Sequence, residues 1–441
     1  MIEMKKYKLG ELLDVKRGTS LAGEYYSTTG EYIRLTCGNF DYTNNSFKEN
    51  TSKDNIFYTG NIREEFIMQK GDIITPLTEQ AIGLLGSTAI IPESNKYIQS
   101  QDVAKIICNE DLLYPMYAFY LISSESVKKQ LSAAAQQTKI RHTSPDKIKD
   151  CTVWIPSLTT QKKVASVLSS LDKKIALNKQ INQNLEALAR QLYDYWFVQF
   201  DFPNEDGKPY KSSGGKMVYN PILKREIPEG WEIVTLSSYI SKNNTGDWGK
   251  DEYFEKCIQV GCVRGADIVT LCNLPTRYIK NNPSKLLQPL DLVIEISGGS
   301  PTQATGRSAF ITEGVINRNG GAISCSNFCH AFTMKNIKKA PYFFYLWRTF
   351  YENDIMFNYE GKTSGLKNFM TDTFLANVWY DVPDNLTNIF YEKIMAIFTQ
   401  IDNNIAENLS LTKQRDELLP LLMNGQVNFD LLVWIVIFAR K

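Results

Sequence analysis

The chain has 441 residues, 43% of them hydrophobic and 12% aromatic, which suffices for packed cores in roughly two to four domains. Its 49 basic and 48 acidic residues give a net charge of +1. This argues against a polybasic nucleic-acid binder, although charge can be segregated onto one face or supplied by a partner. Eight cysteines without a CxxC pair indicate neither a disulfide framework nor a zinc ribbon, and reduced thiols in a cytoplasmic protein are expected.

Residues 1–156 predict a mixed α/β domain with many short strands, punctuated by Gly and Asn. Buried strands are expected at residues 73–74 and 89–91, and a helix is expected over residues 114–131. The first six residues lack an apolar run, so no signal peptide is expected.

Residues 157–202 predict one long helix. Apolar residues recur mostly every three or four positions from Val164 to Trp196, and neither Gly nor Pro interrupts the segment. At about 1.5 Å per residue, about 40 residues make a rod of roughly 60 Å. Residues 203–229 are rich in Gly and Pro and predict a linker with little regular structure.

Residues 230–383 predict a second mixed α/β domain, and residues 384–426 predict a second long helix, which Pro420 is expected to kink or end. Residues 427–441 form an apolar tail of unknown role. The tail could dock on the core, pair with a partner, or come from a truncated reading frame. Its apolar run of about nine residues is shorter than the roughly 20 that a membrane span needs, so no membrane partner is expected.

The two halves repeat one pattern. Residues 118–121 (AFYL) return as 343–346 (FFYL), and residues 171–178 (LDKKIALN) return as 401–408 (IDNNIAEN). The offset of roughly 220–230 residues is far longer than the periods of about 20–50 residues in solenoids. Two copies predict two similar surfaces related by an approximate two-fold axis, which suits a dyadic target such as duplex DNA.

The two long amphipathic helices are expected to pack on each other in antiparallel fashion, because neither can leave its apolar face in water. Asn178 and Asn182, which align with Asn408 and Thr412 in the repeat, are expected near the seam. Polar residues at such positions fix the register of a helix pair. The alternative is two independent helices, each packed on its own domain.

Catalytic motifs are not recognisable. Residues 361–363 (GKT) resemble the end of a phosphate-binding loop, but Met356 occupies the position of its first glycine. The aromatic base-clamp motif of adenine and cytosine amino-methyltransferases is missing, and there are only two histidines. Cys325, Cys329 and His330 have poor spacing for zinc, so no metal site is expected. The sequence therefore favours a binding protein over an enzyme.

Several helical segments resemble the conserved regions of type I restriction–modification specificity subunits. These are residues 155–158 (IPSL), 168–175 (LSSLDKKI), 184–192 (NLEALARQL) and 196–200 (WFVQF), and residues 8–12 (KLGEL) resemble the start of a target-recognition domain of that family. The second copy departs from the pattern, because it has no counterpart of residues 196–200.

The resemblance implies an α+β fold: two mixed α/β target-recognition domains in a pseudo-two-fold arrangement, separated by two long antiparallel coiled-coil helices. Domains 1–156 and 230–383 would each read one half of a split site in double-stranded DNA. The helical spacers 157–202 and 384–426 would dock two modification subunits, which bind S-adenosylmethionine. Restriction and motor subunits would supply ATP and Mg²⁺ chemistry, so this chain itself would be non-catalytic and carry no cofactor.

Groove reading needs Arg or Lys for guanine and Asn or Gln for adenine. The polar segment 136–143 concentrates such residues, and its counterpart in the repeat is 361–368. The candidate DNA-binding residues are Lys16, Arg17, Thr19, Arg34, Asn39, Lys139, Arg141 and His142 in the first domain, and Arg264, Arg307, Arg318, Asn319, Lys362, Thr363 and Lys367 in the second.

Two other functions stay open. The chain could be a scaffold whose two similar lobes bind proteins and never contact DNA, which sequence-specific protection of DNA by the reconstituted complex would distinguish. It could also be an enzyme with an unrecognised active site, in which case the chain alone would transfer methyl groups from S-adenosylmethionine to DNA.

Overall fold

The structure is a computed structural model that divides into two compact units. Unit 1 comprises Met1–Ile175 and Ser410–Lys441, and unit 2 comprises Ala176–Leu409. The structure describes residues 3–51, 54–79, 83–134, 141–300, 302–363 and 365–426, without the side chains of Lys362 and Thr363. The apolar tail 427–441 lies outside the described residues.

Unit 1 is built on a four-stranded antiparallel sheet whose strand order is β10-β8-β12-β2. A smaller sheet has the order β11-β4-β7-β3, in which β11 and β4 are parallel, and three further strand pairs are β1–β14, β5–β6 and β9–β13. The strands are β1 (Lys5–Lys8), β2 (Leu13–Arg17), β3 (Tyr26–Ser27), β4 (Tyr32–Arg34), β5 (Phe40–Asp41), β6 (Ser46–Phe47), β7 (Phe57–Tyr58), β8 (Ile73–Pro76), β9 (Thr78–Glu79), β10 (Ala89–Ile90), β11 (Tyr97–Ile98), β12 (Val103–Cys108), β13 (Arg141–His142) and β14 (Thr152–Ile155).

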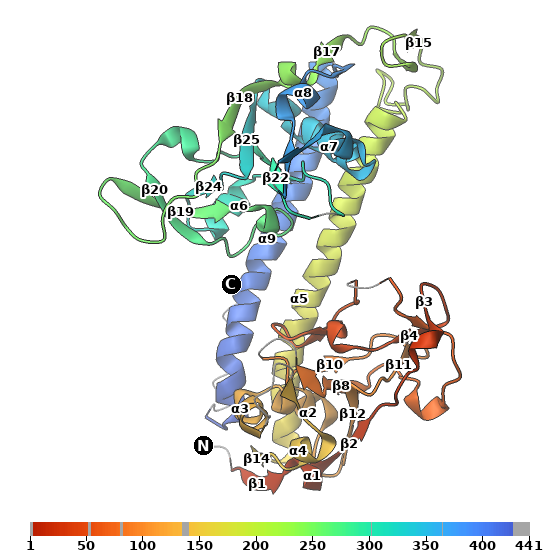
Figure 1. Ribbon diagram of the computed structural model, residues 1–441, viewed down its shortest axis with the longest axis vertical. Helices are drawn as coiled ribbons and strands as arrows, with labels where there is room; N and C mark the ends of the chain where they lie inside the picture. Colours follow the sequence, from red (N-terminus) through yellow and green to blue (C-terminus); the bar gives the residue numbers. More distant parts are fainter. Residues whose placement is uncertain are drawn as a thin grey trace. The chain divides into compact units, whose positions relative to one another are not determined.

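Four helices of unit 1 share a core with the main sheet: α1 (Leu9–Leu12), α2 (Pro115–Ile122), α3 (Glu125–Ala134) and α4 (Pro145–Lys149) (Figure 1). The unit also contains the short helices η1 (Gly23–Tyr25), η2 (Cys37–Asn39) and η3 (Glu64–Phe66). The single helix expected over residues 114–131 is in fact two, because the chain breaks at Ser123, which leaves helical geometry. The expected buried strands at 73–74 and 89–91 are confirmed as β8 and β10.

Unit 2 is built on a sheet of order β18-β25-β21-β23. A second sheet has the order β20-β19-β24, in which β19 and β24 are parallel, and a third has the order β22-β27-β26. The strands are β15 (Met217–Asn220), β16 (Arg225–Pro228), β17 (Ile233–Thr235), β18 (Ile240–Thr245), β19 (Cys257–Val263), β20 (Thr276–Lys280), β21 (Leu292–Glu295), β22 (Ser297–Gly298), β23 (Ser308–Phe310), β24 (Ile323–Cys325), β25 (Cys329–Met334), β26 (Glu360–Thr363), β27 (Leu366–Phe369) and β28 (Val378–Tyr380).

Helix α7 forms the centre of the unit 2 core, where Phe343 and Trp347 are almost fully buried. The helical elements are α6 (Glu313–Arg318), α7 (Ala340–Glu352) and α8 (Thr371–Leu375), with the π-helix η4 (Asp194–Val198) and the short helices η5 (Leu236–Tyr239), η6 (Gly265–Asp267), η7 (Pro283–Lys285), η8 (Ile337–Lys339) and η9 (Ile355–Tyr359). Residues Trp196, Phe197 and Phe200, which have no counterpart in the second copy, are buried in this aromatic core.

The repeat seen in the sequence is present in the topology. The order β10-β8-β12-β2 in unit 1 equals β23-β21-β25-β18 in unit 2, and the parallel pair β11–β4 has its counterpart in β24–β19. The strand pair β1–β14 likewise corresponds to β17–β28. The expected α+β fold with two similar mixed domains is therefore confirmed within each unit.

The two long helices, α5 (Leu158–Tyr193) and α9 (Asp384–Met423), pack on each other in both units. In unit 1, Asp172 of α5 pairs with Arg415 of α9 at 3.1 Å, and Leu168 shares a core with Leu422. Residue numbers rise along one helix as they fall along the other, so the pair is antiparallel, as expected.

Asn178 and Asn182 both lie at the seam in unit 2, as expected. Asn178 Nδ2 donates to Asn408 Oδ1 at 3.0 Å, and Asn404 Nδ2 donates to Asn182 Oδ1 at 2.7 Å. The two contacts follow from the antiparallel direction, because moving four residues forward on α5 moves the contact four residues backward on α9. None of the described helices is long and apolar enough to cross a lipid bilayer.

Two local expectations need correction. The segment 203–229, expected to have little regular structure, contains the antiparallel hairpin β15–β16. Helix α9 does not end at Pro420 but continues to Met423, because a proline disrupts mainly the turn before it and little helix remains beyond it. The helix then ends near Asn424 and Gly425, as expected.

Candidate nucleic-acid interface

The candidate residues of unit 1 lie at one end of the main sheet. Strand β2 ends at Arg17, which is paired with Ala104 near the start of β12, and Ala104 is paired on its other side with Thr75 near the end of β8. The chain then continues from β8 into β9, which pairs with β13. Three segments that are far apart in the sequence therefore lie at one end of the main sheet. They are residues 16–19, 75–79 and 141–142.

A glycine ends the edge strand in both units. Gly18 follows β2, and a Cβ atom there would overlap the carbonyl oxygen of Ser100. Gly246 follows β18 and is packed in the same way against the carbonyl oxygen of Ser326. Only glycine allows this backbone approach. The two glycines lie 228 positions apart, which agrees with the offset of the repeat. The repeat in the sequence therefore pointed to both glycines, although they were not among the candidate residues.

The described parts of the segments 136–143 and 361–368, which the offset of the repeat matches, occupy equivalent places. His142 of β13 pairs with Thr78 of β9, and Asn368 of β27 pairs with Ser297 of β22. Strands β9 and β22 each follow a central strand of the main sheet, β8 or β21. In each unit, the described part of the polar segment thus lies at the same end of the sheet as the glycine.

Three candidates of unit 1 are accessible at this end. The side chains of Lys16 and Arg17 are exposed, although Arg17 Nε donates to the carbonyl oxygen of Gln101 at 2.9 Å. Thr19 is half-buried and forms a β-bridge with Ser100. Lys16 and Arg17 belong to β2, whose backbone is paired with β12, so the sheet holds these two side chains in place. Thr19 follows the end of β2.

Arg34 and Asn39, in contrast, are buried and bonded within unit 1. The Arg34 guanidinium lies 3.9 Å from the ring centroid of Tyr26 and donates to the carbonyl oxygen of Asn55. Asn39 accepts a hydrogen bond from the backbone of Thr36 at 2.9 Å and donates to the backbone of Lys48. Arg34 thus fixes Asn55, shortly before β7, and Asn39 holds the loop between β4 and β6.

Arg141 and His142 extend from β13. Arg141 Nη1 lies 3.2 Å from Ser132 Oγ and 3.9 Å from Glu79 Oε1, while the side chain of His142 is exposed. Glu79 also accepts from the backbone of Gly83, so it joins the β8–β10 connection to β13. Lys139 lies outside the described residues.

In unit 2, Arg264 and Arg307 each make a two-pronged ion pair with a carboxylate. Arg264 contacts Asp267 at 2.7 and 2.9 Å, and Arg307 contacts Glu295 at 2.8 and 2.7 Å. Gly265 lies directly against Glu295, so the two pairs adjoin at the end of β21. The Arg264 pair closes the loop after β19, and the Arg307 pair joins the residue before β23 to the end of β21.

The remaining candidates of unit 2 are also engaged. Arg318 binds Asp402 of α9 at 2.6 Å, Asn319 bonds the backbone of Leu271 and Val315, and Lys367 binds Glu360 at 3.0 Å. The backbone of Lys362 and Thr363 belongs to β26, which pairs with β27, and their side chains are not described.

Aromatic residues near the same end were not among the sequence candidates. Trp248 follows Gly246, and the Arg277 guanidinium lies 4.0 Å from its ring centroid. The nearby Tyr253 is 73% exposed, and Tyr25, in the corresponding connection of unit 1, is 43% exposed. Aromatic rings next to basic residues are common in nucleic-acid interfaces, so their clustering in these two connections was a usable signal.

Unit 2 contains two buried thiols, Cys262 and Cys329, and the half-buried His330. Burial raises the pKa of Cys262 and Cys329 to about 12, and it lowers the pKa of His330, so all three side chains are uncharged at neutral pH. In the described ranges, no three His, Cys, Asp or Glu side chains are grouped to hold a metal ion.

Residues 1–187 match the family model of the type I restriction modification DNA specificity domain. The match covers 187 of the 441 residues. It spans unit 1 through α4 and most of α5, and it includes most of the segments that carry the resemblance in the sequence.

Known specificity subunits are similar to the chain over nearly its full length. The MjaIX specificity subunit of Methanocaldococcus jannaschii is 24% identical over 412 residues, which are 91% of this chain and 84% of the relative. The HindI specificity subunit of Haemophilus influenzae is 22% identical over 474 residues, covering 97% and 100% of the two chains. The resemblance to type I specificity subunits is thereby confirmed.

The fold is also shared with a solved structure. The crystal structure of a type I restriction-modification system S subunit from M. genitalium superposes with a TM-score of 0.58 at 15% identity, and 96% of each chain is covered.

Proposed function

We propose that the chain is the DNA-recognition subunit of a type I restriction–modification complex and that it reads a bipartite site in double-stranded DNA. The observation that carries this proposal is the duplicated sheet end, where a glycine-terminated edge strand and a short polar strand pair lie together in both units. Two such ends match two half-sites, and the type I specificity domain of residues 1–187 gives them a DNA target.

The side chains with free polar groups are the readers in this proposal. Lys16, Arg17, Thr19 and His142 protrude from strands that are fixed on one side, which suits a defined approach to base edges. Lys139, Lys362 and Thr363 belong to the same segments and remain candidates.

The engaged side chains position the loops. Arg34, Asn39, Arg264 and Arg307 already use their hydrogen-bonding groups within the chain, and exchanging those bonds for bonds to a base would leave a carboxylate or backbone group unpaired. Arg141, Arg318 and Lys367 act in the same way through Glu79, Asp402 and Glu360.

The long helices also offer a surface to protein partners. Leu177, Ile181 and Leu188 of α5 are 51%, 36% and 51% exposed, and at about 3.6 residues per turn they lie on one face. Exposed apolar stripes of this kind are typically covered by a partner. We assign the stripe to one of two modification subunits, which bind S-adenosylmethionine and methylate the DNA, while restriction and motor subunits supply ATP and Mg²⁺ chemistry. The chain itself then performs no catalysis.

The test is single-molecule sequencing of DNA methylation in host cells. We expect a bipartite methylated motif that disappears when the gene is deleted. Combined replacement of Thr19 and His142 by alanine should relax or abolish recognition in one half of the motif only, since both residues belong to unit 1; a lost bidentate or equivalent contact weakens base discrimination by about 1–3 kcal/mol.

The matched control is Lys129→Ala, which removes an exposed cation of α3 that pairs with Glu125 away from the sheet end. It should leave both halves unchanged. A chain whose deletion alters no methylated motif, while modification subunits still bind it, would be a scaffold and not a recognition subunit.

A further inference from the structure

A cavity of about 460 Å³ lies within unit 2, between the recognition fold and the long helices. Its walls come from α5, α7, α9, the strand β23 and the loop after η6. Its volume falls in the range of about 300–1,000 Å³ that is usual for small-molecule sites. None of the DNA-reading side chains proposed above lines it.

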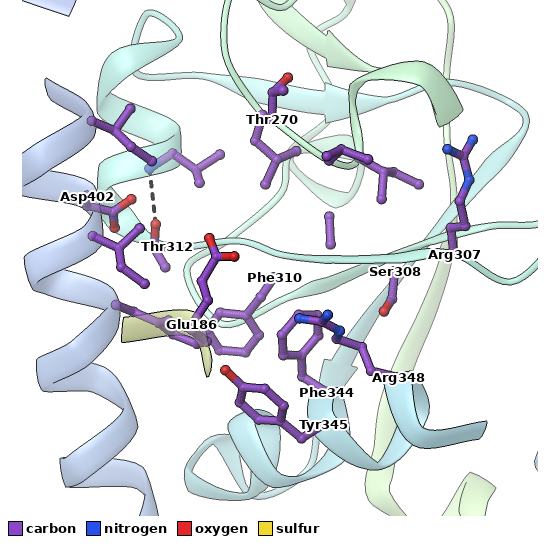
Figure 2. A pocket seen from close by; sticks show the side chains of 18 of the residues that line it. Glu186, Thr270, Arg307, Ser308, Phe310, Thr312, Phe344, Tyr345, Arg348 and Asp402 are labelled. Atoms are coloured by element: carbon purple, nitrogen blue, oxygen red, sulfur yellow. Dashed lines mark hydrogen bonds between the residues drawn. The ribbon is translucent and has the colours of Figure 1, made fainter. Parts of the chain in front are cut away.

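One side of the cavity is aromatic. Phe310 of β23 lies 5.4 Å from Phe344 of α7 and 5.0 Å from Phe398 of α9, measured between ring centroids, and Tyr345 of α7 stacks on Phe398 at 6.4 Å. Figure 2 shows Phe310, Phe344 and Tyr345 grouped together with Glu186 of α5. Ring faces carry partial negative charge and attract cations.

The charges around this wall leave one negative charge in excess. Arg190 binds Asp194 at 3.1 Å and Glu352 at 3.2 Å, and Arg348 binds Glu352 at 3.0 Å. Glu186 makes no ion pair with any described residue. Glu186, Arg348 and Glu352 line the cavity, whereas Arg190 and Asp194 do not. Together these residues supply three carboxylates and two guanidinium groups. The other two arginines that line the cavity, Arg307 and Arg318, are balanced by Glu295 and Asp402.

The cavity also contains an unused hydrogen-bonding group. The hydroxyl of Ser308 is buried and has no hydrogen-bond partner among the described residues. Such groups are uncommon in folded proteins and are usually paired with water or a ligand. Glu186 itself is exposed at the mouth of the cavity, so a ligand could reach it from solvent.

We propose that this cavity binds a small organic cation, with its apolar or aromatic body against Phe310, Phe344 and Phe398 and its ammonium or guanidinium group at Glu186. An anion is disfavoured, because each arginine in the cavity is already paired with a carboxylate. A neutral apolar ligand would leave Glu186 without a counter-charge. The site is distinct from the apolar stripe of α5, since Glu186 points to the side of that helix opposite Leu177 and Leu188.

The test uses the purified full-length chain and tryptamine, which combines an aromatic body with an ammonium group. Isothermal titration calorimetry should give saturable binding of tryptamine, and indole-3-propionate, which has a similar body and a carboxylate, should bind at least about tenfold more weakly. Glu186→Gln keeps the size of the side chain and removes its charge, so it should weaken tryptamine binding about tenfold while the melting temperature of the free chain stays unchanged.

The control is Glu392→Gln, which removes an exposed carboxylate of α9 that does not line the cavity. It should leave the affinity for tryptamine unchanged. Absence of saturable binding to the wild-type chain, equal affinity for indole-3-propionate, or unaltered affinity of Glu186→Gln would each overturn the proposal. Because none of these measurements involves DNA, their outcome is independent of the proposed role in recognition.

Discussion

Gly18 and Gly246 show how a single residue fixes a functional edge. Each lies where an edge strand turns against the backbone that precedes the next strand of the same sheet, and its amide donates to the carbonyl oxygen of Val103 or Cys329. A side chain at either position would push the two backbones apart. The residues that follow, Thr19 and Trp248, are placed by this contact.

We therefore expect Gly18→Ala to reduce the free energy of unfolding by about 2–4 kcal/mol, because the new methyl group overlaps a carbonyl oxygen that belongs to backbone and cannot rotate away. Urea denaturation followed by circular dichroism measures the change. Gly23→Ala is the control, since a Cβ there meets no atom within 4 Å. A loss of stability equal in the two variants would contradict the close contact.

The arginines of unit 2 illustrate what a residue type alone can predict. Arg264, Arg307 and Arg318 were chosen as groove readers because guanidinium groups recognise guanine, and each instead binds a nearby carboxylate. Arg264 and Asp267 are three residues apart, so that pair was accessible to sequence reasoning. Glu295 and Asp402 are brought to Arg307 and Arg318 only by the packing of strands and helices.

The antiparallel pair of α5 and α9 is stabilised by apolar contacts and interrupted by buried polar groups. Asn404 Nδ2 donates to Asn182 Oδ1 at 2.7 Å, and Asn182 Nδ2 lies 3.4 Å from the carbonyl oxygen of Ile401. Buried amide groups are tolerated only in the register that pairs them, so they exclude helix pairings displaced by a turn.

Replacing Asn404 by leucine should lower the free energy of unfolding by about 1–3 kcal/mol, because the carboxamide oxygen of Asn182 stays buried without its donor. The double variant Asn182→Leu/Asn404→Leu should recover most of that loss, because neither side chain then leaves a buried carboxamide without its partner. Chemical denaturation of the single and double variants measures this coupling.

Asn184→Leu, at an exposed position of α5, is the control and should change stability by less than about 0.5 kcal/mol. A double variant that is less stable than the single variant would show that the hydrogen bond is not the source of the effect.

The two units of the molecule have the same strand topology in their main sheets but differ in local details. The two main sheets have the same strand order, yet the edge strand of unit 2 begins with a register shift between Ile240 and Lys242, and unit 2 adds the pair β26–β27 beside β22. A common frame with differing edge loops agrees with the proposal that the two domains read different half-sites.

The family resemblance implies that the long helices separate the two recognition domains, so we expect the length of these helices to set the spacing of the two half-sites. Four residues inserted after Asn178 and four before Asn408 add one turn, about 6 Å, to both helices and preserve their pairing. The recognised spacer should then lengthen by roughly two base pairs at about 3.4 Å each.

Methylome sequencing of cells that carry the insertion variant measures the spacer. The control inserts four residues into the turn between β15 and β16, which lies outside the helices and should leave the motif unchanged. An unchanged spacer in the helix variant, with methylation retained, would rule out the helices as a ruler.

The sequence by itself determined the repeat, the two long helices, their antiparallel pairing and the family, because these depend on periodicity and on segments that recur at a fixed offset. It also matched the polar segments 136–143 and 361–368 to each other by their offset, but the structure alone showed that their described parts form strands at the ends of the sheets. Only the tertiary structure decided which of the candidate side chains are free. Contacts such as Arg307 with Glu295 or Asn182 with Asn404, and the shared cavity of Glu186 and Phe344, join residues whose distance in space depends on the register of strands and of the helix pair. Local sequence carries no information about this register.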